Sequence, residues 1–240
     1  MNEGESPGLK RSIGVFGAAS VGIANIIGAG IFVISGIAAG LAGPSVILSF
    51  LIAGLISLLT ALSTAELSSF ITKTGAAYAF SERAYGRLPG FTVGWFMYFG
   101  RIVSASAVSI GFAGYVIKIL GLNGDLPIVT FALSLPLVFV ILNIIGVKES
   151  TMATSIMVII KVAALILLIA FGGVYLFSNF HPENFTPFFP NGVNGALDGA
   201  AVIFFAFMGF NTVAMMSEET KNPTETIPRA LILALSLIHI

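Results

Sequence analysis

This chain of 240 residues contains no cysteine, and only 9% of its residues are charged. Without cysteine it cannot form disulfides, use a thiolate as a nucleophile or bind a metal through sulfur. Soluble globular chains carry about 25% charged residues, so this composition argues against a soluble fold. The formal net charge is zero, so the chain lacks the basic surface that nucleic-acid binding requires.

Hydrophobic residues are abundant instead and make up 57% of the chain. They fall into six apolar runs long enough to cross a bilayer, which predicts an all-α integral membrane protein with the lipid bilayer as its solvent. The predicted helices are Ile13–Ala39, Ser45–Glu66, Gly90–Leu120, Leu126–Gly146, Thr151–Phe177 and Leu197–Met216. A seventh helix begins near Ile227, and the amphipathic stretch Thr72–Gly90 predicts a short helix at the membrane interface.

The basic residues between the predicted spans are unevenly distributed, which indicates an orientation. One side of the membrane receives Lys10, Arg11, Lys73, Arg83, Arg87, Lys148, Lys221 and Arg229. The other side receives only Lys118, together with Asp125, Glu183 and Asp198. By the positive-inside rule, we expect a multi-pass plasma-membrane protein with its N-terminus in the cytoplasm.

The stretch "NIIGAGIF" (Asn25–Phe32) places Gly28 and Gly30 in the middle of an apolar helix. Each glycine costs about 1 kcal/mol against alanine there, so two of them need a reason. One interpretation is close helix packing, which also fits Gly36 with Gly40 and Gly90 with Gly94. The other is an interrupted helix, whose free backbone N–H and C=O groups beside a water-filled site suit a zwitterion of amino-acid size. The sequence leaves both open.

The sixth span contains a second candidate interruption at Gly209, within "FFAFMGFNTV" (Phe204–Val213). A single glycine in a phenylalanine-rich helix is typical of packing. Two interrupted segments at corresponding positions of two halves, however, indicate an inverted-repeat transporter.

Four stretches of this chain resemble amino acid permeases of the amino acid–polyamine–organocation superfamily. They are "NIIGAGIF", "AELSSF...TKTGAAYAF" (Ala65–Phe80), "GRLPGFTVGW" (Gly86–Trp95) and "FFAFMGFNTVAMMSEETKNPTETIPRA" (Phe204–Ala230). The resemblance implies a leucine-transporter-type inverted-repeat bundle, truncated to six transmembrane helices and the start of a seventh. Residues 1–12 would be a cytoplasmic tail and residues 13–234 the truncated transporter domain, which by itself would lack a complete transport path.

The resemblance also implies a function: secondary active transport of an amino acid or related amine, with no cofactor and no metal. The substrate's α-carboxylate and part of its α-amino group would lie at the unwound segment of the first span, Ile27, Gly28, Ala29, Gly30 and Ile31. The sixth span would complete the site with an unwound segment of its own, Phe205, Ala206, Phe207, Met208 and Gly209. Phe205 matches the position of an aromatic gate over the substrate.

Lys161 lies ten residues after Thr151, about 15 Å along a helix, inside the fifth span. A charge there costs about 2.5–3.5 kcal/mol on insertion scales, which marks it as a candidate functional residue. The alternative is a side chain that snorkels to the interface. The resemblance implies that its ammonium occupies the place of a sodium ion at the first interruption, which predicts proton coupling.

Arg101, in the third span, is a second cation inside the membrane. It could balance an acidic side chain, hold a carboxylate or line a pocket or gate, and no family motif distinguishes these roles. Ser104, with Ser106 and Ser109, could line the same cavity or bond to backbone carbonyls. For Glu66, Glu218 and Glu219 we favour solvation at the interface or pairing with loop arginines over a cytoplasmic gate.

Other function classes fit less well. A membrane-embedded amino-acid sensor or assembly partner that does not transport is the main alternative. An enzyme is not expected, because the spans hold no paired carboxylates, nucleophile–base pair or metal-ligand cluster. The phenylalanine-rich sixth span favours neutral over charged amino acids, but the sequence leaves the amino acid, the choice between exchange and net uptake, and the oligomeric state open.

The last six residues, "LSLIHI" (Leu235–Ile240), match the translation of a transposase adaptor used in sequencing libraries. We hypothesise that residues 235–240 derive from such an adaptor; the alternative is a chance apolar ending. Resequencing the locus tests this, and a natural stop codon directly after Ile240 would contradict it.

Overall fold

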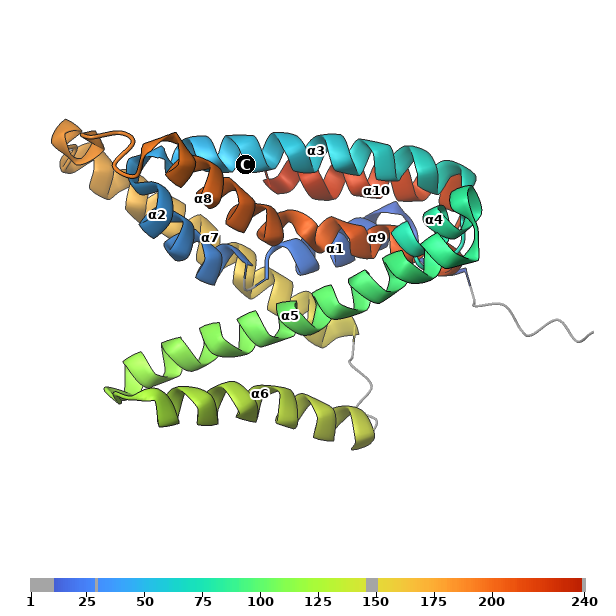
Figure 1. Ribbon diagram of the computed structural model, residues 1–240, viewed down its shortest axis with the longest axis horizontal. Helices are drawn as coiled ribbons and strands as arrows, with labels where there is room; N and C mark the ends of the chain where they lie inside the picture. Colours follow the sequence, from blue (N-terminus) through green and yellow to red (C-terminus); the bar gives the residue numbers. More distant parts are fainter. Residues whose placement is uncertain (1–10, 29, 146–150, 239–240) are drawn as a thin grey trace, which may run out of the picture.

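The computed structural model describes residues 11–28, 30–145 and 151–238, and these form helices joined by short loops (Figure 1). The α-helices are α1 Val15–Ile26, α2 Ser35–Ala42, α3 Val46–Phe70, α4 Ala77–Tyr85, α5 Arg87–Leu120, α6 Asp125–Ile145, α7 Thr151–Ser178, α8 Gly192–Phe207, α9 Asn211–Met215 and α10 Pro223–Ile238. One turn of π-helix, Gly30–Ile34, lies between α1 and α2, and a 3₁₀ turn, Met208–Phe210, lies between α8 and α9. Further 3₁₀ turns are Gly43–Ser45, Pro182–Phe185 and Ser217–Glu219.

Five stretches are long and apolar enough to cross a membrane, and the first of them, Val15–Phe70, contains two spans. The chain reverses between these two spans at Gly43. Two observations require glycine there: its φ is +59°, and a Cβ would clash with the ring of Pro190. The predicted all-α membrane fold is therefore confirmed, and Val15–Phe70 is long enough to hold the first two of the six predicted spans. α10 begins at Pro223, four residues before the expected start, because proline is tolerated in the first turn of a helix.

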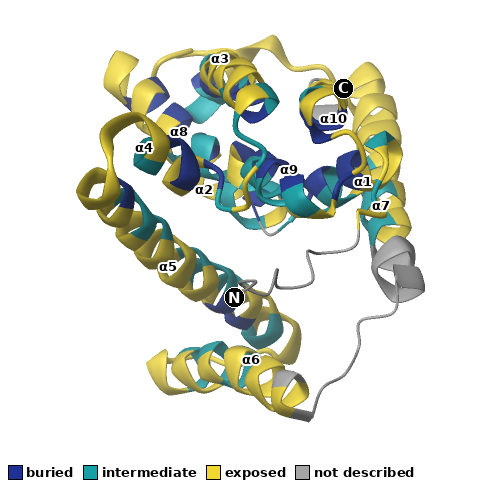
Figure 2. Ribbon diagram, turned by 90° about the vertical axis from the view of Figure 1, so that its right-hand side faces the viewer, coloured by how far each residue is buried: buried dark blue, intermediate teal, exposed yellow. Residues whose placement is uncertain are grey.

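The buried core lies in the bundle of α1, α2, α3, α8, α9 and α10 (Figure 2). Its larger cluster joins α1, α3, α9 and α10 and is rich in alanine: Ala18, Ala19, Ala61, Ala65, Ala214, Ala230 and Ala234, around Phe210, Val213 and Leu231. Small side chains let membrane helices approach closely, since van der Waals contact rather than the hydrophobic effect holds them together in lipid. Ser49 adds an interhelical hydrogen bond of 2.7 Å to the carbonyl of Ala196.

Outside this bundle, α5 and α6 lie side by side, and α7 runs behind α1 and α2 and contacts α1 (Figure 1). Most of their described residues are exposed, as Figure 2 shows, and the exposed side chains are largely apolar. No described residue in the span windows of α6 and α7 is buried. An apolar exterior of this kind is what a bilayer requires of a spanning helix.

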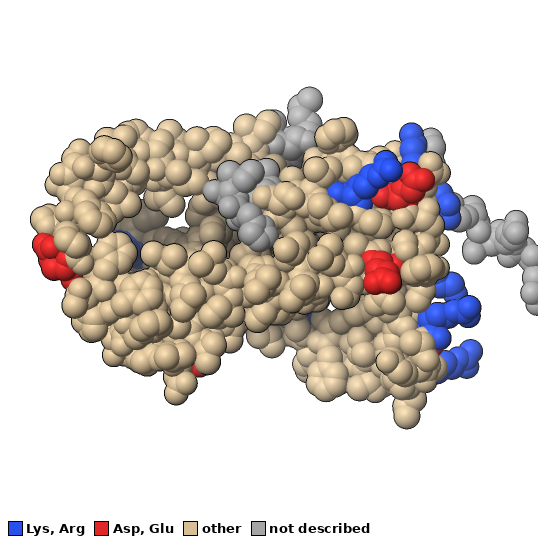
Figure 3. Space-filling model, turned by 90° about the horizontal axis from the view of Figure 1, so that it is seen from above, with Lys and Arg blue, Asp and Glu red and all other residues tan. Residues whose placement is uncertain are grey.

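The Lys and Arg side chains gather mainly at one end of the molecule (Figure 3), which we call the charged end. Its described cations are Arg11, Lys73, Arg83, Arg87, Lys221 and Arg229; Lys10 and Lys148 lie outside the described residues. The short helix predicted within Thr72–Gly90 is present as α4, at this end, and its position at the membrane interface stays a prediction.

At the charged end, backbone hydrogen bonds join the segment before α1 to the loop before α10. The N–H groups of Ser12 and Ile13 donate to the carbonyl of Glu219 at 3.0 and 3.1 Å, and Lys221 N–H donates to the carbonyl of Ile13 at 2.8 Å. The Glu218 carboxylate accepts the N–H of Thr74 at 3.1 Å, so it binds backbone rather than a loop arginine. Glu66 and Glu219 are exposed and form no ion pair within the described residues, in agreement with solvation.

The glycines test the close-packing interpretation one by one. It is confirmed for Gly90 and Gly94, where a Cβ would lie 2.7 Å from Glu82 Cβ and 3.0 Å from Tyr78 Cδ2. It is wrong for Gly36 and Gly40 within the described residues, because nothing there lies within 4 Å of their hypothetical Cβ. Equal spacing in sequence thus gives one pair that faces a neighbouring helix and one that does not.

Gly22 provides a stability test of the bundle. A Cβ at Gly22 would lie 2.5 Å from Val213 Cγ2 and 3.0 Å from Ala234 Cβ, so Gly22→Ala should destabilise the fold by about 1–3 kcal/mol through overpacking. Gly36→Ala is the control and should be neutral or stabilising, by up to about 1 kcal/mol, through helix propensity. Denaturation of both variants in detergent, followed by circular dichroism, measures the difference; equal stability of the two would contradict this account of α1.

Candidate functional site

The first span is interrupted where its two glycines predicted. α1 ends at Ile26, and Ile27 adopts φ −76° and ψ 64° while Gly28 N–H donates to the carbonyl of Ile26 at 2.8 Å. This combination is an inverse γ-turn. Ala29, which we also expected in this segment, lies outside the described residues, and the chain resumes at Gly30 as one turn of π-helix.

Two glycines bring the first and sixth spans into direct backbone contact. A Cβ on Gly30 would lie 2.7 Å from the Cα of Ala206, and a Cβ on Gly209 would lie 2.6 Å from the backbone of Asn25 and Ile26. Neither distance leaves room for any side chain. Close packing and helix interruption, posed as alternatives by the sequence, therefore occur together at this crossing.

The sixth span does not unwind, and the prediction of an unwound segment at Phe205–Gly209 is wrong. Phe207 (φ −79°, ψ −19°) and Met208 (φ −60°, ψ −10°) keep helical dihedral angles, and Met208 N–H donates to the carbonyl of Phe205. The backbone only tightens into a 3₁₀ turn, whose hydrogen bonds run from i to i−3. Gly209 is needed there to admit the backbone of α1 rather than to break the helix.

The expected site residues differ in how they are buried. Ile27 is only 7% exposed and Gly30 is buried, whereas Met208 is 47% exposed. Half-buried positions are Gly28, Ile31, Phe205, Ala206 and Gly209. Phe207, at 6% exposure, packs with Ala38 and Ala53, so its side chain belongs to the core between α2, α3 and α8.

α5 supports the π-helical turn through two residues that sequence reasoning missed. The Tyr115 hydroxyl donates to the carbonyl of Phe32 at 2.5 Å, and Gly111 admits Val33, whose Cγ2 would lie 2.7 Å from a Cβ there. Gly111 and Tyr115 are four residues apart and share one helix face. That spacing could have indicated from the sequence that Gly111 and Tyr115 face the same neighbour, although it could not identify the neighbour as the Gly30–Ile34 turn.

Arg101 contacts the sixth span rather than an acid. Its Nη2 donates to the Met215 sulfur at 3.3 Å, and it has no carboxylate partner within the described residues. Ser106 and Ser109 bond to the carbonyls of Ile102 and Ala105, which confirms the backbone interpretation for these two serines. Ser104 is half-buried on the same helix.

Lys161 is half-buried on α7, a helix that contacts α1. It forms no ion pair, and no hydrogen bond of its side chain exists within the described residues. Because Ala29 lies outside those residues, the predicted contact of Lys161 with the interruption stays a prediction.

Ser57 of α3 is a further polar group that the sequence did not single out. It is fully buried, and its hydroxyl has no hydrogen-bond partner in the described part of the chain. It shares a face with Ala53, which packs with Phe207, and Ala61, which packs with the Phe210 cluster. An unsatisfied buried hydroxyl is costly, so it marks a polar spot beside the 3₁₀ turn of the sixth span.

Residues 17–240 match the sequence model of the family described as "Amino acid permease". The chain belongs to the amino acid permease family. It is 39% identical to the branched-chain amino acid permease BcaP of Bacillus subtilis, over 95% of this chain and 52% of that protein. It is 36% identical to the methylthioribose transporter of the same bacterium, over 98% of this chain and 54% of that protein.

A plant relative, the vacuolar cationic amino acid transporter 2 of Arabidopsis thaliana, is 36% identical over 98% of this chain and 40% of its own length. The chain thus spans about half the length of the curated relatives it matches. Family membership confirms the resemblance seen in the four motifs. Together with the apolar helices, it makes this permease a multi-pass membrane protein.

Tyr115→Phe tests the support of the interrupted span. Loss of the hydrogen bond to Phe32 leaves a carbonyl without its donor, which should cost about 1–3 kcal/mol locally. We expect faster hydrogen exchange in the peptide that covers Gly30–Ile34, measured by mass spectrometry in detergent. Tyr98→Phe, an exposed tyrosine on the same helix, should leave this exchange unchanged, and equal protection in both variants would show that Tyr115 does not hold the turn.

Proposed function

We propose that the whole permease carries out secondary active transport of an amino acid, with the substrate held at the interruption of the first span. The observation that carries this proposal is the junction between α1 and the Gly30–Ile34 turn. The C-terminal end of a helix offers carbonyls that suit an ammonium group, and the N-terminal end offers N–H groups that suit a carboxylate. A junction of two such ends is complementary to the α-amino and α-carboxylate groups of one zwitterion.

The sixth span supplies the opposite wall in this proposal. Ala206 and Gly209 touch the first span, Met208 is exposed, and Phe205 is placed one turn before Gly209. We assign Phe205 as the aromatic gate. These side chains are apolar and Arg101 is the nearby cation, which supports a neutral rather than a cationic substrate. The name of the branched-chain amino acid permease relative agrees with that choice.

We also propose that Lys161 couples transport to protons. It is the one charged residue of the predicted fifth span, half-buried, and α7 reaches α1. An ammonium group near freed carbonyls would take the place of a sodium ion, and its proton would leave and return during the cycle. The gathering of Lys and Arg at the charged end supports a cytoplasmic N-terminus, and we propose the plasma membrane as the location.

The full-length protein, purified and reconstituted in liposomes, tests transport and coupling together. Radiolabelled leucine should be taken up faster with an inward proton gradient than at equal pH, without dependence on sodium, and faster than arginine. Lys161→Gln should abolish the pH dependence, whereas Lys118→Gln, an exposed lysine at the opposite end, should keep it. No uptake of any amino acid would refute the function; an unchanged pH response in Lys161→Gln would refute the coupling only.

Gly30→Ala and Gly209→Ala test the position of the substrate. Each added methyl group would displace the opposing backbone, at a cost of about 1–3 kcal/mol. If the substrate lies at this crossing, that cost corresponds to a loss of roughly 5- to 140-fold in leucine affinity. Equilibrium binding of radiolabelled leucine to the purified protein measures the effect. Gly36→Ala should bind like the wild type, and wild-type binding by both crossing variants, with monodisperse protein, would place the substrate elsewhere.

A further inference from the structure

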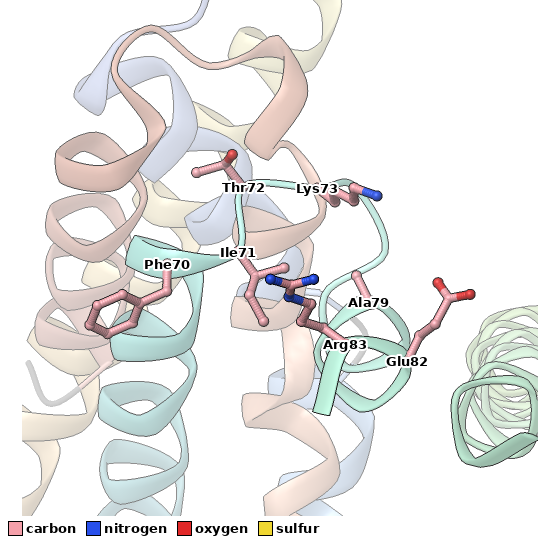
Figure 4. A pocket seen from close by; sticks show the side chains of 7 residues that line it. All are labelled: Phe70, Ile71, Thr72, Lys73, Ala79, Glu82 and Arg83. Atoms are coloured by element: carbon pink, nitrogen blue, oxygen red, sulfur yellow. The ribbon is translucent and has the colours of Figure 1, made fainter. Parts of the chain in front are cut away.

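A pocket of about 490 Å³ opens at the charged end, between the C-terminus of α3 and helix α4 (Figure 4). Two cations line it, Lys73 from the loop and Arg83 from α4. Its other walls include Phe70, Ile71 and Ala79, which are apolar. The pocket is therefore amphipathic and lies far from the crossing of the first and sixth spans.

The two cations of this pocket are not neutralised. Neither Lys73 nor Arg83 forms an ion pair or a side-chain hydrogen bond within the described residues, whereas Arg229 at the same end lies 3.5 Å from Glu225. Glu82 also lines the pocket, but its carboxylate turns away from the Arg83 guanidinium (Figure 4). The pocket thus offers an anion two cations that form no ion pair in the described part of the chain, against the single carboxylate of Glu82.

The apolar wall continues onto the membrane-facing surface. Phe70 is 79% exposed at the end of span α3, with its ring pointing away from Lys73 and Arg83 (Figure 4), and Tyr85 at the end of α4 and Leu88 in α5 are each 78% exposed. Since α4 lies at the ends of the spans, the pocket is at the depth where phospholipid headgroups meet acyl chains. A soluble anion would contact only the two cations, whereas a lipid would also contact exposed apolar side chains at this depth, such as Tyr85 two residues after Arg83.

We propose that this pocket binds an anionic glycerophospholipid. Its phosphate contacts Lys73 and Arg83, and its acyl chains extend into the membrane beside the exposed apolar side chains at this end of the bundle. Arginine presents a planar fork of donors that matches phosphate oxygens, and lysine adds a point charge. Basic pockets at the membrane surface bind such headgroups. The bound lipid would fix α4 against the loop in which Thr74 already holds Glu218.

Trp95 is the only tryptophan of the chain and reports on this region. It follows Gly94, where a hypothetical Cβ would lie 3.0 Å from Tyr78 of α4. The chain is reconstituted in phosphatidylcholine vesicles that contain brominated phosphatidylglycerol or, in parallel, brominated phosphatidylcholine. Bromine quenches tryptophan fluorescence at short range, so the two titrations give the preference for the anionic lipid.

We expect a preference on the order of tenfold for brominated phosphatidylglycerol, since each basic side chain contributes several-fold near an anionic headgroup. Lys73→Gln with Arg83→Gln should abolish it, and Lys73→Gln alone should reduce it about threefold. Lys221→Gln with Arg229→Gln, which removes two cations at the same end but outside the pocket, should retain it.

Three outcomes would overturn the proposal. One is equal quenching by both brominated lipids in the wild type. Another is equal loss of preference in the control pair, which would mean a general surface-charge effect. The third is displacement of brominated phosphatidylglycerol by added inorganic phosphate at constant ionic strength, which would identify a site for the free anion.

Discussion

The contact between Gly30 and Ala206, and its counterpart between Gly209 and the Asn25–Ile26 backbone, is the constraint on which the rest of this permease depends. Two helices of the bundle meet there without an intervening side chain. Because Gly30 follows the end of α1 so closely, the first span can meet the sixth only by changing direction. The inverse γ-turn and the π-helical turn are the local form of that change.

Neighbouring groups form hydrogen bonds with backbone groups at the interruption and so offset part of the free energy lost where the helix ends. Gly28 donates to Ile26 within the turn, Ser35 returns a hydrogen bond of 2.6 Å to the carbonyl of Ile31, and Tyr115 reaches the carbonyl of Phe32 from α5. Backbone groups inside a bilayer must be satisfied by protein or by enclosed water. The third span is therefore coupled to the interruption, and a movement of α5 would be felt at the proposed substrate site.

The sequence predicted the spans to within a few residues because apolar runs bounded by charged loops have one stable arrangement in lipid. At Gly28–Gly30, where two helix-weakening residues coincide, it left close packing and interruption open, and only the resemblance to the permeases favoured the interruption. It failed at Gly209 because a glycine that breaks a helix and one that admits a neighbouring backbone look the same in sequence. Tyr115 and Ser57 escaped notice for a related reason: their roles depend on partners far away in the chain.

Some polar side chains inside the spans do not bond to a carbonyl of their own helix, and these side chains are unevenly distributed among the helices. Most described serines and threonines of the spans return their hydroxyls to carbonyls three or four residues earlier, which suits a helix in lipid. The exceptions are on helices that touch the first or sixth span: Ser57 on α3, Arg101 against Met215, and Lys161 on α7. Unpaired polar groups are expensive in a bilayer unless water or a polar ligand reaches them. Ser57, Arg101 and Lys161 all lie on helices that touch the two central spans, as an aqueous path along that crossing would require. Ser68, two residues before the end of α3, is the other buried hydroxyl without a partner in the described chain, and it lies outside this group.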